Sequence, residues 1–300
     1  MCVVLPALAL AQYTQITNLP TIYINTFNNR SITSRSTYVL STLTWVEGED
    51  CITYDSVEIR GRGNSTWNLA KKPYRIRFKT PQKFLGRGFA KARSWTLLAN
   101  HADKSLIRNA VTFDMGDFLG QPFAPAAKFV DLVLNGTYLG NYQISDQVNV
   151  DNKRVEIVEQ DVPADAESNI TGGYLLEIDG FGTSEPVFFR TSKNLIVNVH
   201  SPDETIINTA QRNYIKNYLD TYERTLFNSK TYKDPDVGYR ALTDTSTLIS
   251  WYIASELSAN PDCFWSTYIY KDCDDPKIYF GPLWDYDIAY NNCDRVGDVT

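Results

Sequence analysis

The chain has 300 residues, of which 43% are hydrophobic and 21% are charged, the composition of an ordinary globular protein. Its length suffices for one large domain or for two lobes with a cleft between them. The formal net charge of −6 argues against a nucleic-acid surface as the main function, and the 19 Tyr and 6 Trp residues are typical of many half-buried strands.

The first eleven residues, MCVVLPALALA, are apolar and end on Ala9-Leu10-Ala11, a cleavage pattern of secretory signal peptides. The run is too short to span a bilayer, and no other stretch of the sequence comes close. We interpret residues 1–11 as the end of a signal peptide, and we expect residues 12–300 to be secreted, periplasmic or held at the cell surface. The alternative is a buried N-terminal strand.

Between residues 20 and 200 the sequence predicts mostly strands, because short runs of β-branched and aromatic residues alternate with turn residues. One helix interrupts them at Lys104–Leu119, with Asp103 or Ser105 as its N-cap and Gly120 at its end. The dipeptide Asn135-Gly136 predicts a hairpin. The predicted strands are Thr21–Asn25, Val57–Arg60, Tyr74–Lys79, Phe129–Leu134, Tyr138–Ile144, Gly173–Ile178 and Asn194–Val199.

The pattern changes after about residue 203, where helices are predicted at Thr205–Phe227 and Thr245–Ser258. Two strands follow, Trp265–Lys271 and Lys277–Phe280, and we expect them to form a hairpin. Asp161–Thr171 is the best candidate for a loop or insertion. A strand-rich part that leads into a helical part indicates an α+β fold.

Three carboxylates near the C-terminal end could hold a divalent metal. Asp262 precedes the predicted hairpin and Asp285 follows it, so the hairpin would return both residues to one region. Asp287 would face the same side as Asp285 if this segment were a strand. Mg²⁺ takes carboxylates together with substrate phosphates, which points to phosphoryl transfer. The alternative is an acidic turn whose carboxylates cap helices or bond to the backbone.

A second candidate site is the segment RGRGNSTW, which begins at Arg60 and is followed by Lys72 on the approach to a strand. Glycines between Arg60 and Arg62 would let the backbone approach an anion, and guanidinium groups would add charge-assisted bonds. The segment lacks the phosphate-binding spacing of known nucleotide loops, so a solvated basic hairpin is the alternative.

A third cluster, Asp103-Lys104-Ser105 with Arg108-Asn109, lies at the start of the predicted helix, and because helix N-termini attract anions it could contact phosphate. The alternative is ordinary helix capping. Export would place Cys51, Cys263, Cys273 and Cys293 in an oxidising compartment, where a disulfide within the last three is an option. A zinc site is the weaker interpretation, because there is no CxxC pair and the two histidines lie far away.

Seven ordered segments together resemble the CotH family of atypical protein kinases, which is named for a spore-coat protein. The resemblance runs from about residue 20 onward, and no single motif decides it. The segments are IRGRGNSTW at 59–67, KKPYRIRF at 71–78, SWTLLANHADKSLIRN at 94–109, LNGTYLGNYQISDQV at 134–148, GGYLLEID at 172–179, ELSANPDCFWSTYIYKD at 256–272 and GPLWDYDIAYNN at 281–292.

This resemblance implies an atypical protein-kinase-like, two-lobed fold, with a strand-rich N-terminal lobe over about residues 20–200 and a helical C-terminal lobe over about 203–300. ATP and Mg²⁺ would be the cofactors. It also implies roles for three residues. Asp262 would orient or deprotonate the acceptor hydroxyl, Asp285 would bind metal with help from Asp287, and Lys72, rather than Lys71, would pair with phosphate.

Two positions depart from the family's pattern. Asp146 stands where many relatives carry the glutamate that would pair with the lysine. Ser266 stands where a second metal-binding Asn is expected after Asp262, and Asn291 or Asn292 could substitute for it. Both ends of the chain look clipped, so we expect an incomplete helical lobe.

The leading hypothesis is an exported, Mg²⁺-dependent phosphotransferase that moves the γ-phosphoryl group of ATP to Ser or Thr of a protein. One alternative is a non-catalytic surface protein that uses the same scaffold for adhesion or recognition. Another is a metal-dependent hydrolase of phosphate esters or sugars that uses the same carboxylates.

Overall fold

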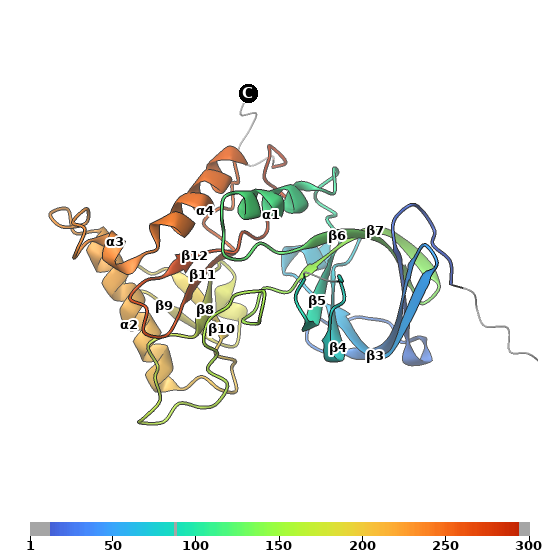
Figure 1. The fold of residues 1–300 in the computed structure, drawn as a ribbon, viewed down its shortest axis with the longest axis horizontal. Coiled ribbons are helices and arrows are strands. Elements are labelled where there is room, and N and C mark those ends of the chain that lie inside the picture. The colour runs from blue at the N-terminus through green and yellow to red at the C-terminus, as the bar shows by residue number, and fades with distance from the viewer. Residues whose placement is uncertain (1–12, 87–88, 294–300) are drawn as a thin grey trace, which may run out of the picture. The chain divides into compact units, whose positions relative to one another are not determined.

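The computed structural model of the chain describes residues 13–86 and 89–293 (Figure 1). The segment interpreted as a signal peptide, residues 1–11, lies outside the described residues. Contacts within the chain divide it into two compact units whose segments alternate along the sequence. Unit 1 comprises Met1–Pro81, Arg93–Ala99 and Lys128–Ile144, and unit 2 comprises Gln82–Ala92, Asn100–Ala127 and Ser145–Thr300.

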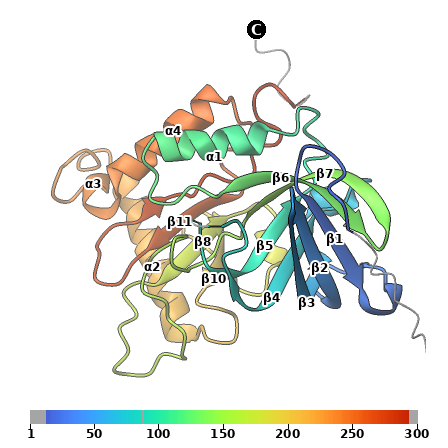
Figure 2. The ribbon, with the colours of Figure 1, turned by 45° about the vertical axis from the view of Figure 1, so that its right-hand side comes forward.

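Unit 1 is built around a closed barrel of seven strands in the order β1-β2-β3-β4-β5-β7-β6 (Figure 2). Parallel pairing of β1 with β6 closes it, with Thr21 opposite Asp131. Closure leaves no unpaired sheet edge. The strands are β1 (Thr21–Thr26), β2 (Val39–Glu47), β3 (Asp50–Gly61), β4 (Tyr74–Gln82), β5 (Ala92–Leu98), β6 (Ala127–Leu134) and β7 (Thr137–Asp146).

Side chains alternate along the barrel strands between a buried and a more exposed side. On β4, Tyr74, Ile76 and Phe78 are buried, whereas the residues between them are half-buried. Val57 and Ile59 alternate in the same way on β3. This period of two is the pattern of strands with one face in a hydrophobic core.

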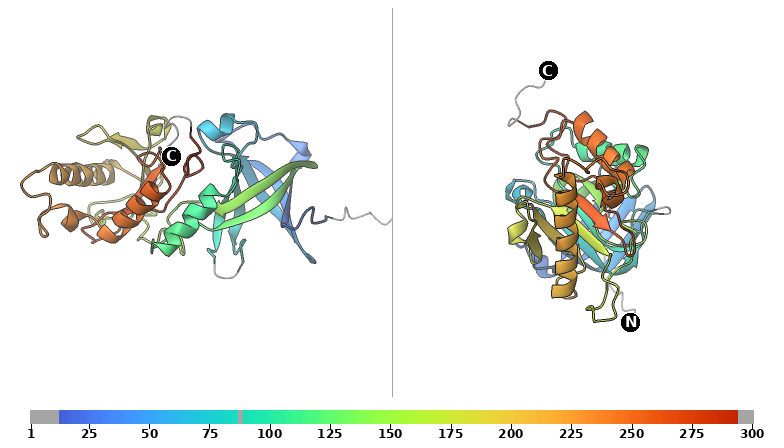
Figure 3. Two further views of the ribbon diagram at one scale, coloured as in Figure 1. Left: turned by 90° about the horizontal axis from the view of Figure 1, so that it is seen from above. Right: turned by 90° about the vertical axis from the view of Figure 1, so that its left-hand side faces the viewer.

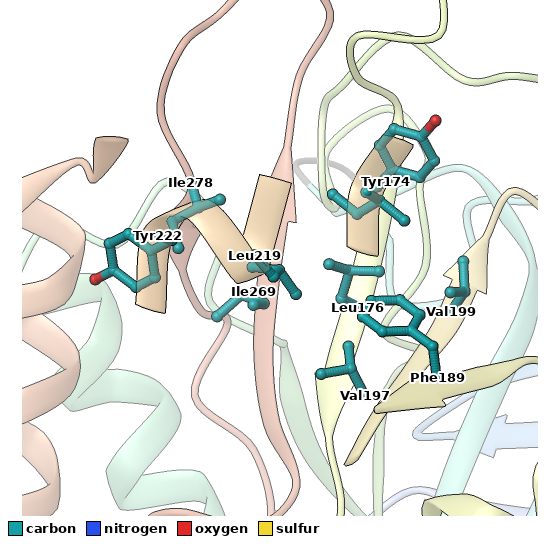
Figure 4. Close-up of a cluster of buried hydrophobic side chains, with 10 residues drawn as sticks. Tyr174, Leu176, Phe189, Val197, Val199, Leu219, Tyr222, Ile269 and Ile278 are labelled. Carbon is teal, nitrogen blue, oxygen red and sulfur yellow. The ribbon is translucent and has the colours of Figure 1, made fainter. Parts of the chain in front are cut away.

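Unit 2 contains a five-stranded sheet in the order β12-β11-β8-β10-β9. Helix α2 covers one face of it, as Figure 3 (right) shows, and Figure 4 shows the buried core between them. In this core Ile215 and Leu219 of α2 pack with Leu176, Val197 and Ile269 of the sheet. The strands are β8 (Tyr174–Ile178), β9 (Phe188–Arg190), β10 (Ile196–Ser201), β11 (Thr267–Lys271) and β12 (Tyr279–Phe280).

Two further helices of unit 2 lie side by side, α1 and α4 (Figures 1 and 2). Leu283, Tyr286 and Ala289 pack with Ala254 of α4 in a small buried cluster, to which Met115 of α1 adds contact. The α-helices are α1 (Arg108–Phe118), α2 (Thr209–Leu226), α3 (Tyr239–Leu242) and α4 (Thr245–Leu257), and the 3-10 helices are η1 (Phe27–Asn29), η2 (Ser65–Asn68) and η3 (Gly182–Ser184).

The expected α+β, two-lobed kinase-like fold with a helical C-terminal lobe is wrong. The chain is strand-rich, with a closed seven-stranded barrel and about 20% helix. The region expected to be helical contributes β11 and β12, and β11 pairs with β8 along its whole length. Local sequence character changes near residue 203, but this long-range pairing joins strands from both sides of that position.

Most of the individual elements were predicted correctly. Strands occur at all the predicted places, the Asn135-Gly136 turn joins β6 to β7, and β11 pairs with β12 as a hairpin. Helix α1 begins at Arg108 rather than Lys104, because Asp103, Ser105 and Leu106 form turns before it, with Leu106 at a φ of 65°. Strands β2, β5 and β9 were not predicted from the sequence.

No helix in the described part of the chain is long and apolar enough to cross a membrane. Cys51, Cys263 and Cys273 form no disulfide bond.

Candidate functional site

Three segments of unit 2 meet around Tyr286, between the carboxylates that the sequence singled out. Its backbone N–H donates to Asn109 Oδ1 over 2.8 Å, and its hydroxyl lies 3.1 Å from Ser255 Oγ of α4. Tyr286 is 2% exposed, and it also hydrogen-bonds to the side chain of Asn260. The segment Trp284–Asp287 is thereby fixed against α1, α4 and the loop that carries Asp262.

Asp285 and Asp287 differ in their surroundings, although only one residue separates them. This segment is not a strand. Asp285 is exposed and has a φ of 66°, in the left-handed region that Asp and Asn tolerate better than most residues. Asp287 is 8% exposed. The expectation that both would face one side of a strand therefore does not apply.

The Asp287 carboxyl lies in an acidic environment. Burial raises its pKa above the ordinary value, and the charges of Asp103 and Asp262 raise it further. Three carboxylates from three separate segments therefore influence one another within unit 2. A cation at this position would offset their mutual repulsion.

Asp103 is fully buried but is held ionised by donors. Its Oδ1 accepts bonds from the Ser105 N–H (2.9 Å) and hydroxyl (2.6 Å), and its Oδ2 accepts from the Arg108 N–H (2.9 Å). Burial acts to raise the pKa of Asp103, but these bonds and the Arg108 side chain lower it overall. The Arg108 guanidinium also bonds to Ser105 Oγ over 3.1 Å. The positive charge of Arg108 therefore offsets the negative charge of Asp103. The neighbouring Lys104 side chain is exposed.

In unit 1, the glycine-rich loop wraps around Trp67. A Cβ on Gly61 would lie 2.4 Å from the Trp67 ring, so this position has room only for glycine. Lys72 Nζ donates to the Trp67 carbonyl over 2.7 Å and lies 5.5 Å from the Trp67 ring centroid. Arg60 donates to the Gly61 carbonyl over 3.1 Å. Arg60 at the end of β3 and Arg62 and Lys72 in the segment between β3 and β4 therefore all belong to one connection of the barrel unit.

Lys71, which precedes Lys72, and Asp146, at the position of the lysine's expected acidic partner, each contact other groups. Lys71 bonds to the Asn141 carbonyl and lies over the Tyr142 ring, and burial lowers the pKa of its amine. Asp146 forms a buried ion pair with Arg154, with Nε–Oδ1 at 2.8 Å, and also accepts from the Ala126 N–H. Arg154 therefore supplies an ionic partner to Asp146.

The described residues show no group of three or more His, Cys, Asp or Glu side chains placed to hold a metal ion. A cavity of about 450 Å³ in unit 2 lies at the start of α2 between Val187 and Arg212 and is lined by none of the predicted site residues. A small cavity of about 10 Å³ lies next to the candidate site, where Asn260 and Tyr286 help to line it.

The sequence placed Asp103 and Asn109 in the cluster at the start of the predicted helix, but it did not link either residue to the segment around Tyr286. Asn292, considered as a metal ligand, donates to the Asp287 carbonyl over 2.7 Å and to the Ala102 carbonyl over 3.0 Å. The grouping of Asp103 with Lys104 and Arg108 was a signal for this region. Nothing in the spacing linked it to Asp287, which follows it by almost two hundred positions.

A protein-family model described as CotH kinase protein matches residues 59–299, which is most of the chain. No curated protein matches the sequence at a significant level.

Proposed function

Because the chain belongs to the CotH kinase protein family, we propose that it is a Mg²⁺-dependent phosphotransferase that moves the γ-phosphoryl group of ATP to Ser or Thr of a protein. The family supports a kinase-like enzyme that acts on a protein. The nucleotide, the metal, the acceptor residue and the roles given below are our proposal. We also propose that the protein acts outside the cytoplasm, on the evidence of the apolar start of the sequence.

The observation that supports this activity best is the acidic environment of Asp287. Burial and the charges of Asp103 and Asp262 raise the pKa of the Asp287 carboxyl. A bound divalent cation would offset this repulsion, and we assign it to Asp285 and Asp287, following the roles that the family resemblance implies. Bound Mg²⁺ would neutralise charge on the transferring phosphoryl group.

The remaining roles belong to the chain's own side chains. Asp262 would accept or orient the proton of the acceptor hydroxyl. Lys72, Arg60 and Arg62 of unit 1 would bind phosphate oxygens through charge-assisted bonds. Lys104 and Arg108 would do the same in unit 2, with Arg108 positioned by its contacts to Asp103 and Ser105.

The test compares purified wild-type protein with Asp285→Asn for transfer of radioactive γ-phosphate to casein or to itself. Asn also tolerates the positive φ of 66°, so this variant removes the charge with little backbone strain. We expect labelling to fall by about 100-fold or more, because loss of even an outer-shell partner of a metal ligand typically costs about 10–100-fold. Melting temperature should stay nearly constant.

Asp274→Asn is a matched control, because Asp274 is also exposed and has a φ of 57°. It should label at the wild-type rate. Phosphate release to water without protein labelling would instead indicate a hydrolase. If wild-type protein binds no nucleotide with Mg²⁺ or Mn²⁺, the phosphotransferase proposal is wrong and a recognition role gains support.

A further inference from the structure

The half-buried side of β3 and β4 in unit 1 carries several arginines close together. Arg60 on β3 lies directly opposite Arg75 on β4, and Glu58 lies opposite Arg77. The residues between them, Ile59 and Ile76, are fully buried, so the arginines lie on the opposite side of the strands. Like charges directly across a strand pair are destabilising, so this arrangement needs an explanation.

Arg75 is the most constrained of these residues. Its Nε atom is shielded from water and has no hydrogen-bond acceptor among the described residues. Its Nη2 lies 3.4 Å from Ser94 Oγ of β5, a long contact. Burial lowers the pKa of Arg75; Tyr38 acts to raise it, whereas the positive charges of Arg60, Arg62 and Arg77 lower it further. Arg75 is therefore a partly desolvated cation that no carboxylate is found to neutralise.

The guanidinium groups on either side are held in place. Arg77 pairs with Glu58, with Nε–Oε2 at 2.7 Å, and its Cζ lies 4.1 Å from the centroid of the Tyr38 ring. Arg60 lies over the same ring, at 5.1 Å, and donates to the carbonyls of Arg35 and Gly61. Tyr38 thus fixes two arginines beside Arg75, and only Arg77 has an acidic partner among these contacts.

We propose that this arginine face, formed by Arg60, Arg75 and Arg77 with Tyr38 and Ser94, binds an oxyanion of the phosphate class. A tetrahedral dianion would supply the acceptor that Arg75 Nε lacks and would neutralise the excess positive charge. The positive charge of the arginine face is opposite in sign to the net charge of the whole chain, which is −6. The site shares Arg60 with the phosphate-binding residues proposed above, whereas Arg75, Arg77, Tyr38 and Ser94 have no role in that proposal. Anion binding here does not require phosphoryl transfer by the carboxylates of unit 2.

Three probes distinguish the source of the phosphate group: inorganic phosphate, O-phosphoserine and ATP in the presence of EDTA. Each is titrated into the full chain at constant ionic strength, with chloride as the reference anion, while the melting temperature is measured. We expect a saturable rise with at least one probe. If ATP binds most tightly, the site is a nucleotide subsite. If O-phosphoserine binds most tightly, the site recognises a phosphorylated protein side chain. Equal affinities for the three probes would indicate a site for the free anion.

The decisive variant is Arg75→Gln, which removes the charge and the orphaned N–H. Without ligand it should melt at the same or a higher temperature, because repulsion from Arg60 and Arg77 is relieved. Its apparent Kd for phosphate should rise at least about 10-fold. Arg93→Gln on β5 is the control, since Arg93 is exposed and is not among the charges that act on Arg75.

The proposal is wrong if none of the probes raises the melting temperature above that in chloride, or if Arg75→Gln binds phosphate as tightly as wild type. Should Arg75→Gln not fold, Arg77→Gln provides the same comparison. A direct readout is the NMR signal of the Arg75 Nε–H in protein labelled with ¹⁵N-arginine. Phosphate should shift it in wild type, and it should be unaffected by chloride.

Discussion

At the scale of single residues, hydrogen-bond donors decide in which direction the pKa values of two buried aspartates of unit 2 shift. Asp103 is fully buried, yet bonds from Ser105 and Arg108 keep its pKa low. Asp287 has a raised pKa, because the effects of burial and of two nearby carboxylates exceed those of the backbone bonds it accepts. Burial alone therefore does not identify which carboxylate needs a cation. The donors around it have to be counted as well.

His200 should make stability depend on pH. Its Nε2 lies 2.6 Å from Glu177 Oε2, and the Tyr268 ring lies 5.5 Å away. Burial by itself lowers the pKa of His200, but the hydrogen bond and charge of Glu177, with the charges of Glu185 and Asp179, raise it overall. The protonated form is therefore favoured in the folded protein.

Because the folded pKa of His200 is raised, its stabilisation is complete below the unfolded value of about 6.5 and is lost as pH rises through the folded value. Urea midpoints measured from pH 5.5 to 8.5 should fall across that window in wild type. His200→Gln should flatten the fall. His101→Gln, which alters the other histidine of the chain, should retain it. Equal slopes in wild type and His200→Gln would contradict the prediction.

At the scale of elements, α2 has the best-defined start of the helices. Asn208 accepts bonds from the N–H groups of Ala210 (3.0 Å) and Gln211 (3.2 Å), and the Gln211 side chain bonds back to the Asn208 N–H. Asn208 also donates to the Ala164 carbonyl over 2.7 Å. This capping box explains why the helix begins at Thr209 and not at Thr205, as the sequence pattern had indicated.

Asn208→Ala should lower the free energy of unfolding by about 1 kcal/mol, the usual cost of a lost N-cap. Asn208→Asp keeps the acceptor and loses only the bond to Ala164, so its cost should be smaller. Thr209→Ala at the next, exposed position should be nearly neutral. Urea unfolding followed by circular dichroism measures all three. Equal losses for Asp and Ala would contradict this prediction, because the bond to Ala164 rather than the cap would then account for the effect.

The sequence predicted long elements better than their ends. Helices α2 and α4 and the β6–β7 hairpin have clear periodicity or turn residues, and all were found. Strand β9 was missed because three residues are too few to show alternation. Residue types likewise pointed to Asp262 and Asp285, but not to the support of Asn109. Hydrogen bonds between distant segments leave no local trace in the sequence.

At the scale of the whole molecule, the family was predicted correctly and the fold was not. The resemblance rested on ordered motifs, which the family match bears out. The α+β interpretation rested on local sequence patterns, and the two-lobed, kinase-like fold was what the resemblance implied. Local patterns carry no information on strand pairing. Pairing of β1 with β6 and of β11 with β8 decides the architecture. Both pairings join segments separated by about ninety residues or more.

The barrel predicts how fragments of the chain behave. A fragment of residues 13–126 lacks β6 and β7, so the barrel cannot close and β1 and β5 keep open edges. It should show no cooperative unfolding transition. A fragment of residues 13–146 contains all seven strands and should regain one. Hydrogen exchange of the β1 amides compares the two, and strong protection in the shorter fragment would contradict this prediction.

The pairing of β1 with β6 also bears on how the protein is made. Synthesis proceeds from the N-terminus, so Thr21 leaves the ribosome long before its partner Asp131 exists. At about 5–20 residues per second, the first strand waits on the order of 10 s for the segment that completes the barrel. During that interval its apolar residues, Ile22 and Ile24, are available to other nascent chains. A chaperone that binds this segment early should therefore raise the yield more than one that acts after release.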